Sequence, residues 1–231
     1  MPKHSKRYTE ARKLVDQTKK YSSEEAIDLA KKTSTTKFVS SVEVHVRLGI
    51  DPKKSDQIVR STIVFPNSIG KSVRIAAFVT GDKEKEAKEA GADIAGGEEL
   101  INEISQKGNI EFDVAVATPD MMPKLAKLAK VLGPKGLMPN PKTDTVGPNV
   151  KKMVEDLKKG KVAFKNDATG NIHQAIGKSD LDNKALLENF VLLMNTIRKL
   201  KPSSTKGTYF KSITLTTSMG PGIAVDPSDF V

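Results

Sequence analysis

The run Val73-Arg74-Ile75-Ala76-Ala77-Phe78-Val79 ends in five consecutive apolar residues with no polar alternation. A strand of this kind is buried on both faces, which is typical of a parallel sheet covered by helices. We expect further strands over 92–95 and 113–117, and helices over 83–90, 98–106, 123–132 and 150–159. This alternation predicts a small α/β domain built around a parallel sheet.

The sequence on either side of this domain has a different pattern. Ser41-Val42-Glu43-Val44-His45-Val46-Arg47-Leu48 alternates strictly, which predicts a strand with one buried face. Ser22 or Ser23 is suited to cap the helix that follows Tyr21. The other expected elements are strands over 58–65, 162–164 and 209–217, a hairpin partner of 162–164 over 173–177, and helices over 21–32 and 182–200. Together they predict an α+β domain assembled from both ends of the chain.

The net charge of the chain also differs between its two ends and its middle. The chain holds 38 Lys and Arg against 28 Asp and Glu, a net charge of +10. Residues 1–66 carry 14 basic and 8 acidic side chains, residues 67–159 carry 15 and 14, and residues 160–231 carry 9 and 6. Because the two ends hold nearly all the excess, we expect a split basic domain (1–67 plus 160–231) and an inserted, almost neutral domain (68–159).

The composition narrows the class of protein. A positive excess favours an anionic partner, with nucleic acid ahead of a membrane surface. The absence of cysteine excludes disulfides, cysteine-based zinc sites and thiol nucleophiles. No apolar run reaches the roughly 18 residues of a membrane-spanning helix, and the basic start of the chain does not resemble a secretory signal. We therefore expect a soluble, cytoplasmic protein that binds no membrane.

The sequence gives little support for a catalytic function. Thr80-Gly81-Asp82 follows the buried strand with one glycine and an acidic residue, whereas a phosphate-binding loop needs several glycines and no acidic cluster. The three histidines, at positions 4, 45 and 173, have no paired metal-ligand spacing, and no serine lies in a nucleophile elbow. The sequence therefore predicts no catalytic residue, no metal and no cofactor.

Three segments are candidates for binding, each with a plain structural alternative. Leu132 to Lys142 is rich in Gly and Pro, so it is either a rigid loop or a stiff basic loop that presents Lys135 and Lys142 to phosphate. Phe38 either fastens a helix to the sheet or forms an exposed surface for a base or ribose. The hydroxyl-rich segment 216–222 is either an ordinary strand end or a group of donors for phosphate and 2′-hydroxyl.

These motifs resemble the large-subunit ribosomal protein L-one family, the proteins of the ribosomal stalk. The resemblance covers essentially the whole chain. Its most specific element is the run from Leu132 to Lys142, and no other family has the same ordered set. The matching segments are 1–4, 6–8, 37–38, 42–45, 48–52, 55–57, 89–93, 117–120, 132–142, 164–167 with Gly170 and His173, and 218–220.

The resemblance implies a fold and a set of partners. The fold would be two-domain, α/β and α+β: a split α+β RNA-binding domain from both termini, with an inserted Rossmann-like α/β domain of parallel sheet and flanking helices. The partners would be the stalk segment of large-subunit (23S-type) ribosomal RNA, deacylated tRNA at the exit site, and the messenger RNA of the protein's own operon, whose translation it would repress. We expect a monomer when the protein is free of the ribosome.

The resemblance also indicates where RNA binds. The matching RNA-contact positions are Lys37, Phe38, Lys165, Asp167, Ser218, Met219 and Gly220. Ser218 stands where the family pattern leads us to expect Thr, which keeps the hydroxyl and loses a methyl group. Secondary contacts with ribosomal RNA or tRNA are expected at His173, Lys124, Lys127, Lys135 and Lys142, although a structural role for His173 is expected equally.

We therefore expect recognition of RNA shape by the split domain. The inserted domain, hinged near 65–68 and Val162, would add weaker basic contacts, and the two short crossings favour relative motion. Two alternatives stay open: a basic RNA-binding protein without a ribosomal role, and a small-molecule enzyme on the α/β domain.

Overall fold

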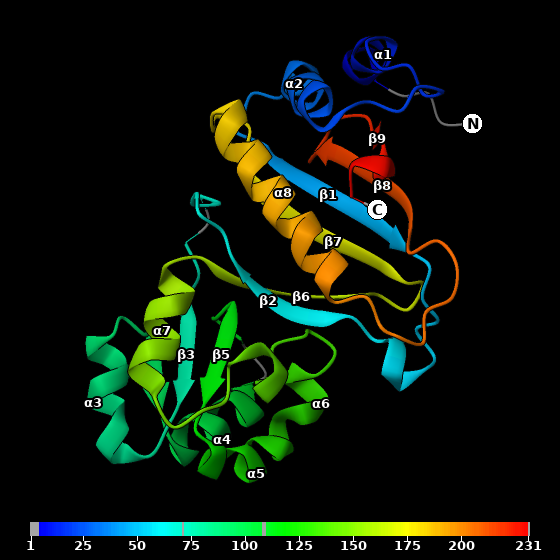
Figure 1. Cartoon of the computed structure of the whole chain (residues 1–231). Helices are drawn as coiled ribbons and strands as arrows, with labels where there is room; N and C mark the ends of the chain where they lie inside the picture. Colours follow the sequence, from blue (N-terminus) through cyan, green and yellow to red (C-terminus); the bar gives the residue numbers. More distant parts are fainter. Residues whose placement is uncertain (1–4, 71, 108–109, 231) are drawn as a thin grey trace. The chain divides into compact units, whose positions relative to one another are not determined.

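The computed structural model describes residues 5–70, 72–107 and 110–230. The chain forms two compact units (Figure 1): one runs up to Gly70 and resumes at Phe164, and the other comprises Lys71–Ala163. The first unit mixes helices with antiparallel strands, and the second contains a parallel sheet. The predicted fold class, an α+β domain with an inserted α/β domain, is confirmed.

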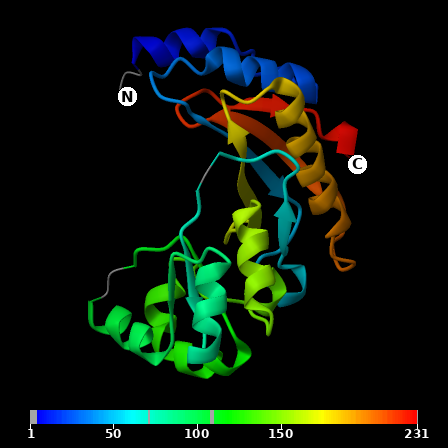
Figure 2. The same ribbon diagram turned by 90° about the vertical axis from the view of Figure 1, so that its left-hand side faces the viewer.

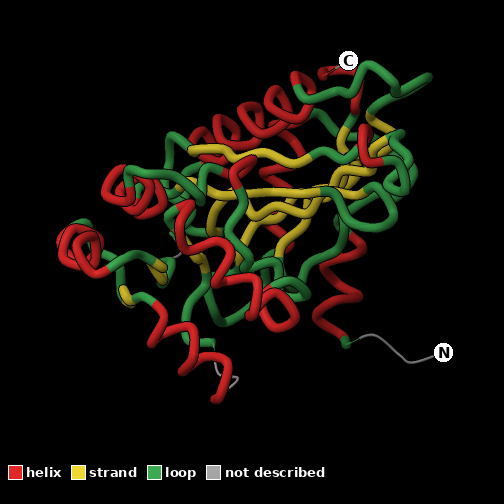
Figure 3. The backbone as a smooth tube through the Cα atoms, turned by 90° about the horizontal axis from the view of Figure 1, so that it is seen from below, coloured by secondary structure: helices red, strands yellow, loops and turns green. Residues whose placement is uncertain are grey.

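The first unit is built on a four-stranded antiparallel sheet in the order β7-β1-β8-β9. Its strands are β1 (Ser41–Leu48), β7 (Asn171–Lys178), β8 (Phe210–Thr217) and β9 (Ile223–Val225). Its helices are α1 (Lys6–Lys13), α2 (Ser23–Thr33) and α8 (Asn183–Lys199). A separate two-stranded sheet pairs β2 (Arg60–Val64) with β6 (Lys161–Lys165). Figure 3 shows the strands of the chain in yellow and its helices in red.

One face of the four-stranded sheet is covered by α2 and α8 (Figures 1 and 2). The valines of β1 point to this face, where Val42, Val44 and Val46 are at most 1% exposed. The alternate residues of β1, from Ser41 to Arg47, keep part of their surface in solvent. The strict alternation in the sequence therefore produces one dry face and one open, polar face.

The predicted hairpin between 162–164 and 173–177 is wrong. β6 pairs with β2, whereas β7 pairs with β1 over seven residues, with Val46 opposite Ile172. This pairing brings Ile172 and Ile176, both fully buried, to the same covered face as the valines of β1. A hairpin with the shorter β6 would not have buried them there, so burial of apolar surface overrides the local turn signal.

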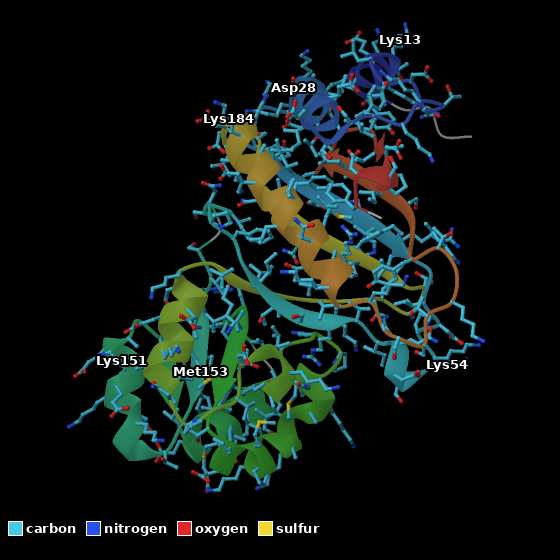
Figure 4. The ribbon with its side chains drawn as sticks, viewed as in Figure 1. Lys13, Asp28, Lys54, Lys151, Met153 and Lys184 are labelled. Carbon is cyan, nitrogen blue, oxygen red and sulfur yellow. The ribbon has the colours of Figure 1, made fainter. Side chains whose placement is uncertain are left out.

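The two covering helices begin at well-defined residues. Ser22 caps α2 in a capping box, because its hydroxyl accepts a hydrogen bond from the Glu25 amide and the Glu25 carboxylate accepts one from the Ser22 amide. At the start of α8, the Asn183 side chain donates to Asp28 of α2, which is labelled in Figure 4. These contacts set the position of α8 against α2.

A buried amide fixes the chain before it leaves the first unit. Asn189 of α8 is fully buried, and its side-chain nitrogen donates to the carbonyls of Ile176 and Asn67 at 2.8 and 3.1 Å. The Asn189 side-chain oxygen accepts from the Asn67 amide at 3.3 Å. Because a buried amide left without partners costs about 1–3 kcal/mol, Asn189 holds the chain at Asn67.

The second unit has a three-stranded parallel sheet in the order β4-β3-β5. Its strands are β3 (Ile75–Phe78), β4 (Ile94–Gly96) and β5 (Val114–Ala117), and its helices are α3 (Gly81–Glu89), α4 (Glu98–Lys107), α5 (Met122–Leu125), α6 (Ala129–Leu132) and α7 (Val150–Lys158). Ala76 and Phe78 pack in a cluster with α4, whereas Ile75, Ala77 and Val79 pack in another with α3 and α7. Helices therefore cover both faces (Figure 1), as the unalternating strand predicts.

The helix predicted over 123–132 is interrupted in the structure. A 3₁₀ turn, Ala126–Leu128, separates α5 from α6. Leu125, Leu128 and Leu132 are all fully buried in the cluster beside α4. The three leucines therefore stay in the core, although a 3₁₀ turn replaces part of the predicted α-helix.

Candidate nucleic-acid interface

Two large apolar side chains lie exposed in segments far apart in the sequence. Phe38, between α2 and β1, is 57% exposed, and Met219, after β8, is 53% exposed. Val39 beside Phe38 is exposed as well. Phe38 is therefore exposed and does not fasten α2 to the sheet.

Hydrogen bonds between Ser41 and Ser218 join the two segments. The Ser41 amide donates to the Ser218 hydroxyl at 3.1 Å, and the Ser218 amide donates to the Ser41 carbonyl at 3.1 Å. Phe38 is three residues before Ser41, and Met219 directly follows Ser218. Both exposed side chains therefore belong to the same end of the β1–β8 pair.

The turn that carries Met219 is tightly built. The Thr216 hydroxyl lies 3.3 and 3.2 Å from the carbonyl oxygens of Gly220 and Pro221. The Gly220 amide donates to the Thr217 carbonyl at 2.9 Å. A β-carbon at Gly220 would lie 2.3 Å from the Thr217 hydroxyl oxygen, so this position accepts only glycine without rearrangement. The turn thus presents Met219 from a rigid backbone.

The open face of the sheet continues this surface with polar groups. The residues of β1 that alternate with the buried valines lie opposite polar residues of its neighbours: Glu43 opposite Thr216, His45 opposite Thr214 and His173, and Arg47 opposite Ser212 and Asn171. Hydroxyls, amides and imidazoles of this kind bind phosphate and ribose without base readout. Of these residues, His173 and Thr216 were candidates from the sequence, and the alternation of β1 places Glu43, His45 and Arg47 on the same face.

Asp167 lies in the turn between β6 and β7, where its carboxylate organises the backbone. It accepts hydrogen bonds from the Thr169 amide and hydroxyl at 2.9 and 2.7 Å and from the Asn171 amide at 2.7 Å. Burial acts to raise the pKa of Asp167, but the hydrogen bonds from Asn171 and Thr169 outweigh it and hold the pKa well below its usual range. The structure thus gives Asp167 a turn-forming role, while Lys165 and Lys37 are exposed.

The lysines singled out in the second unit differ in their surroundings. Lys124 forms an ion pair with Glu98, whereas Lys127, Lys135 and Lys142 are exposed. Because Lys124 already pairs with Glu98, it is less available to bind another anion. Lys127 also acts electrostatically on Glu98 and helps to lower the pKa of that carboxyl, after the larger contribution of Lys124.

The Gly/Pro-rich loop is fastened to its own unit. Leu137 and Met138 pack against the core cluster beside α4. The Asn140 amide donates to the Thr145 hydroxyl at 2.8 Å, and the Asn140 carbonyl accepts from the Thr143 hydroxyl at 3.0 Å. The loop is therefore rigid, and Lys135 and Lys142 on it are exposed.

A hollow lies at the carboxyl ends of β3 and β4, where sheets of this type commonly bind ligands. Its lining includes Glu84, Glu98, Glu99 and Glu103. Acidic side chains repel a phosphate group, so this hollow does not suit a nucleotide. Over residues 5–70, 72–107 and 110–230, no group of three His, Asp or Glu side chains is arranged to hold a metal ion.

None of the helices in the described segments is both long and apolar enough to cross a membrane.

Sequence comparison places the chain in a family. The Ribosomal protein L1p/L10e family matches residues 30–221. The chain is 55% identical over 229 residues to the large ribosomal subunit protein uL1 of Macrococcus caseolyticus, with 99% of each chain covered. It is 52% identical over 228 residues to the protein of the same name from Thermosipho africanus, with 99% of this chain and 98% of that one covered. The family is one of ribosomal proteins, which confirms the prediction of a non-enzymatic protein. The chain belongs to the ribosomal protein L1 family.

Proposed function

We propose that this chain is a constituent of the large ribosomal subunit and binds the stalk segment of its ribosomal RNA in the cytoplasm. Relatives that match nearly the full length are named as large ribosomal subunit proteins. The net charge of +10 supports binding to a polyanion. Basic side chains supply attraction that depends on salt, and the exposed apolar and hydroxyl groups supply the fit to RNA shape.

The observation that carries the proposal is that two exposed apolar side chains, Phe38 and Met219, belong to the same end of the β1–β8 pair. Exposed apolar side chains that gather at one place, as Phe38, Val39 and Met219 do, mark a surface that a partner covers. A base or ribose packs on such a side chain, and the phosphates on either side meet cations. The interface then consists of Lys37, Phe38, Lys165, Ser218, Met219 and Gly220, with Asp167 shaping the adjacent turn.

Three finer activities follow from the family resemblance. The inserted unit adds weaker contacts with ribosomal RNA or tRNA through Lys127, Lys135 and Lys142, with Lys124 contributing less because Glu98 pairs with it. Through these contacts the protein assists release of deacylated tRNA from the exit site. The same interface binds the messenger RNA of its own operon and represses its translation, and the free protein is a monomer.

The test is binding of the purified chain to a stalk RNA fragment between 50 and 500 mM salt, about a tenfold range chosen to resolve counterion release. An unrelated hairpin of equal length serves as the control RNA. We expect the stalk fragment to bind more tightly than the control, and its affinity to fall linearly with salt on logarithmic axes. Equal affinity for both RNAs would contradict the proposal, and so would unchanged binding by a double variant Phe38→Ala, Met219→Ala that stays folded.

A further inference from the structure

Two histidines meet on the open face of the four-stranded sheet. His45 of β1 lies directly opposite His173 of β7 in the strand register. Their Nδ1 atoms are 2.7 Å apart, and the ring centroids are 4.9 Å apart at an angle of 60°. Both side chains retain solvent contact, with exposed fractions of 33% for His45 and 53% for His173. The pair is thus a preformed group that a ligand can reach.

The short Nδ1 to Nδ1 distance determines how many protons the pair holds. A hydrogen bond between two imidazole nitrogens needs one ring to donate and the other to accept, so a single proton lies between them. The outer nitrogens lie near carboxylates: His45 Nε2 is 3.9 Å from Glu43 and His173 Nε2 is 3.6 Å from Asp167. Both Nε2 atoms are therefore favoured as N–H groups, so the pair holds at most one positive charge while the two Nδ1 atoms share a proton.

A second positive charge is resisted in the free protein. Two protonated Nδ1 atoms would point their N–H bonds at each other across 2.7 Å. Burial and the charge of His173 lower the pKa of His45, and Glu43 acts in the opposite direction. Arg47 of β1 and Asp167 of the turn before β7 also lie near this pair, and the residue of β8 opposite His45 is the uncharged Thr214.

An anion between the rings removes this obstacle. If each Nδ1 donates to an oxygen of the anion, the rings separate slightly and both Nδ1 atoms carry a proton. One of these protons was already shared between the rings, and the second comes from solvent. A phosphodiester suits the position because it is negative and purely an acceptor near neutral pH. The carboxylates of Glu43 and Asp167 lie at the opposite ring nitrogens, where they stabilise the imidazolium charge.

We propose that the His45–His173 pair binds a backbone phosphate of RNA and takes up one proton when the complex forms. The inference rests on the proposed function, namely that the open face of this sheet binds RNA. Because the bound state holds more protons than the free state, affinity increases as the pH falls and decreases as it rises. The affinity changes with pH mainly around and below 6.5, the ordinary pKa of histidine.

The test is calorimetry of the full chain with the stalk RNA fragment, at constant ionic strength, in buffers with different ionisation enthalpies. We expect uptake of a fraction of a proton at pH 7 that increases toward pH 6, and a dissociation constant about three- to tenfold lower at pH 5.5 than at pH 8. Binding of this RNA with no proton uptake anywhere between pH 5.5 and 8 would overturn the inference. The proton count needs no substitution, so it does not depend on whether a variant folds.

His45→Asn and His173→Asn are the matched variants, because an amide offers a polar group near Nδ1 but does not titrate in this range. We expect each to bind the RNA more weakly than the unaltered chain at pH 5.5 and to lose the increase in affinity between pH 8 and pH 5.5. Titration of the RNA itself cancels in this comparison. If both variants keep the full pH dependence, the inference is wrong.

The two proposals fail in different ways. If the stalk RNA does not bind more tightly than a control hairpin at any pH, the proposed function is wrong. If it binds specifically and Phe38→Ala weakens it, but no proton is taken up, only the role of the histidine pair is wrong.

Discussion

Ser41 and Ser218 exchange two hydrogen bonds of 3.1 Å, although 176 residues lie between them in the chain. One of the bonds uses the Ser218 hydroxyl, so a side chain and the backbone together close the end of the β1–β8 pair. This closure places the segment with Phe38 beside the turn with Met219. The shape of the candidate interface therefore depends in part on one side-chain hydroxyl group.

Replacing the Ser218 hydroxyl tests how much it contributes to the stability of the fold. For Ser218→Ala we expect the free energy of unfolding to fall by about 1 kcal/mol, because the Ser41 amide loses one acceptor at a partly solvated site. Ser218→Thr keeps the hydroxyl and should be as stable as the unaltered chain. Urea unfolding of the three proteins measures the difference. Equal stability of the Ala variant would show that solvent replaces the lost acceptor.

Phe38→Ala should separate binding from stability. Because Phe38 is 57% exposed, we expect its removal to change the free energy of unfolding by less than about 0.5 kcal/mol. Stacking of a base on the ring predicts a loss of about 1–3 kcal/mol in RNA affinity. Leu14→Ala, at an equally exposed apolar side chain after α1, is the control and should bind RNA normally. Similar affinities for both variants would refute a specific role for Phe38.

Gly220→Ala should distort the turn that carries Met219. The new β-carbon would lie 2.3 Å from the Thr217 hydroxyl oxygen, so the turn or the buried Thr217 side chain must shift. We expect a loss of about 1–3 kcal/mol in stability, as for other overpacked positions, together with weaker RNA binding. Gly81→Ala is the control, since a β-carbon there meets no atom within 4 Å. Thermal unfolding and RNA titration of both variants provide the comparison.

Asp167 should contribute stability that disappears in acid. Hydrogen bonds from Asn171 and Thr169 outweigh burial and lower the pKa of Asp167 below its ordinary value of 3.8. The contribution is therefore present above pH 3.8 and is lost as the pH falls through the lower value of the folded state. We expect Asp167→Asn to be less stable than the unaltered chain at pH 7 and the difference to shrink toward pH 2.

Urea unfolding at several pH values measures this difference. Asp180→Asn, at an exposed carboxylate, controls for the general effect of removing a negative charge. A difference for Asp167→Asn that stays constant down to pH 2 would contradict the assigned cause, because it could not come from ionisation of that carboxylate.

The elements that sequence reasoning located best are those whose burial follows from a regular local pattern. β1 spans Ser41–Leu48 as predicted, because strict alternation admits one register against a core. α2 begins after Ser22, one of the two residues predicted to cap it. The three-stranded parallel sheet was predicted from the unalternating run that became β3. In each case the periodicity of the side chains and the secondary structure agree.

The errors arose where distant contacts decided the outcome. The turn around Asp167 indicated a hairpin, but β7 pairs with β1, more than 120 residues away in the chain. The helix predicted over 123–132 is interrupted by the 3₁₀ turn Ala126–Leu128, although Leu125, Leu128 and Leu132 are all buried. The short strand β9 was not predicted, since its pairing with β8 gives no signal in three residues.

The sequence by itself determined that the chain is basic, that its two ends share a pattern which the middle lacks, and that Phe38 and 218–220 were candidates for binding. It left open whether Phe38 is buried or exposed, and it did not show that His45 and His173 touch. Only the tertiary structure decided these points. Alternation and charge are local properties of the chain, whereas the exposure of one ring and the meeting of two others depend on strand register and on which residues the covering helices bury.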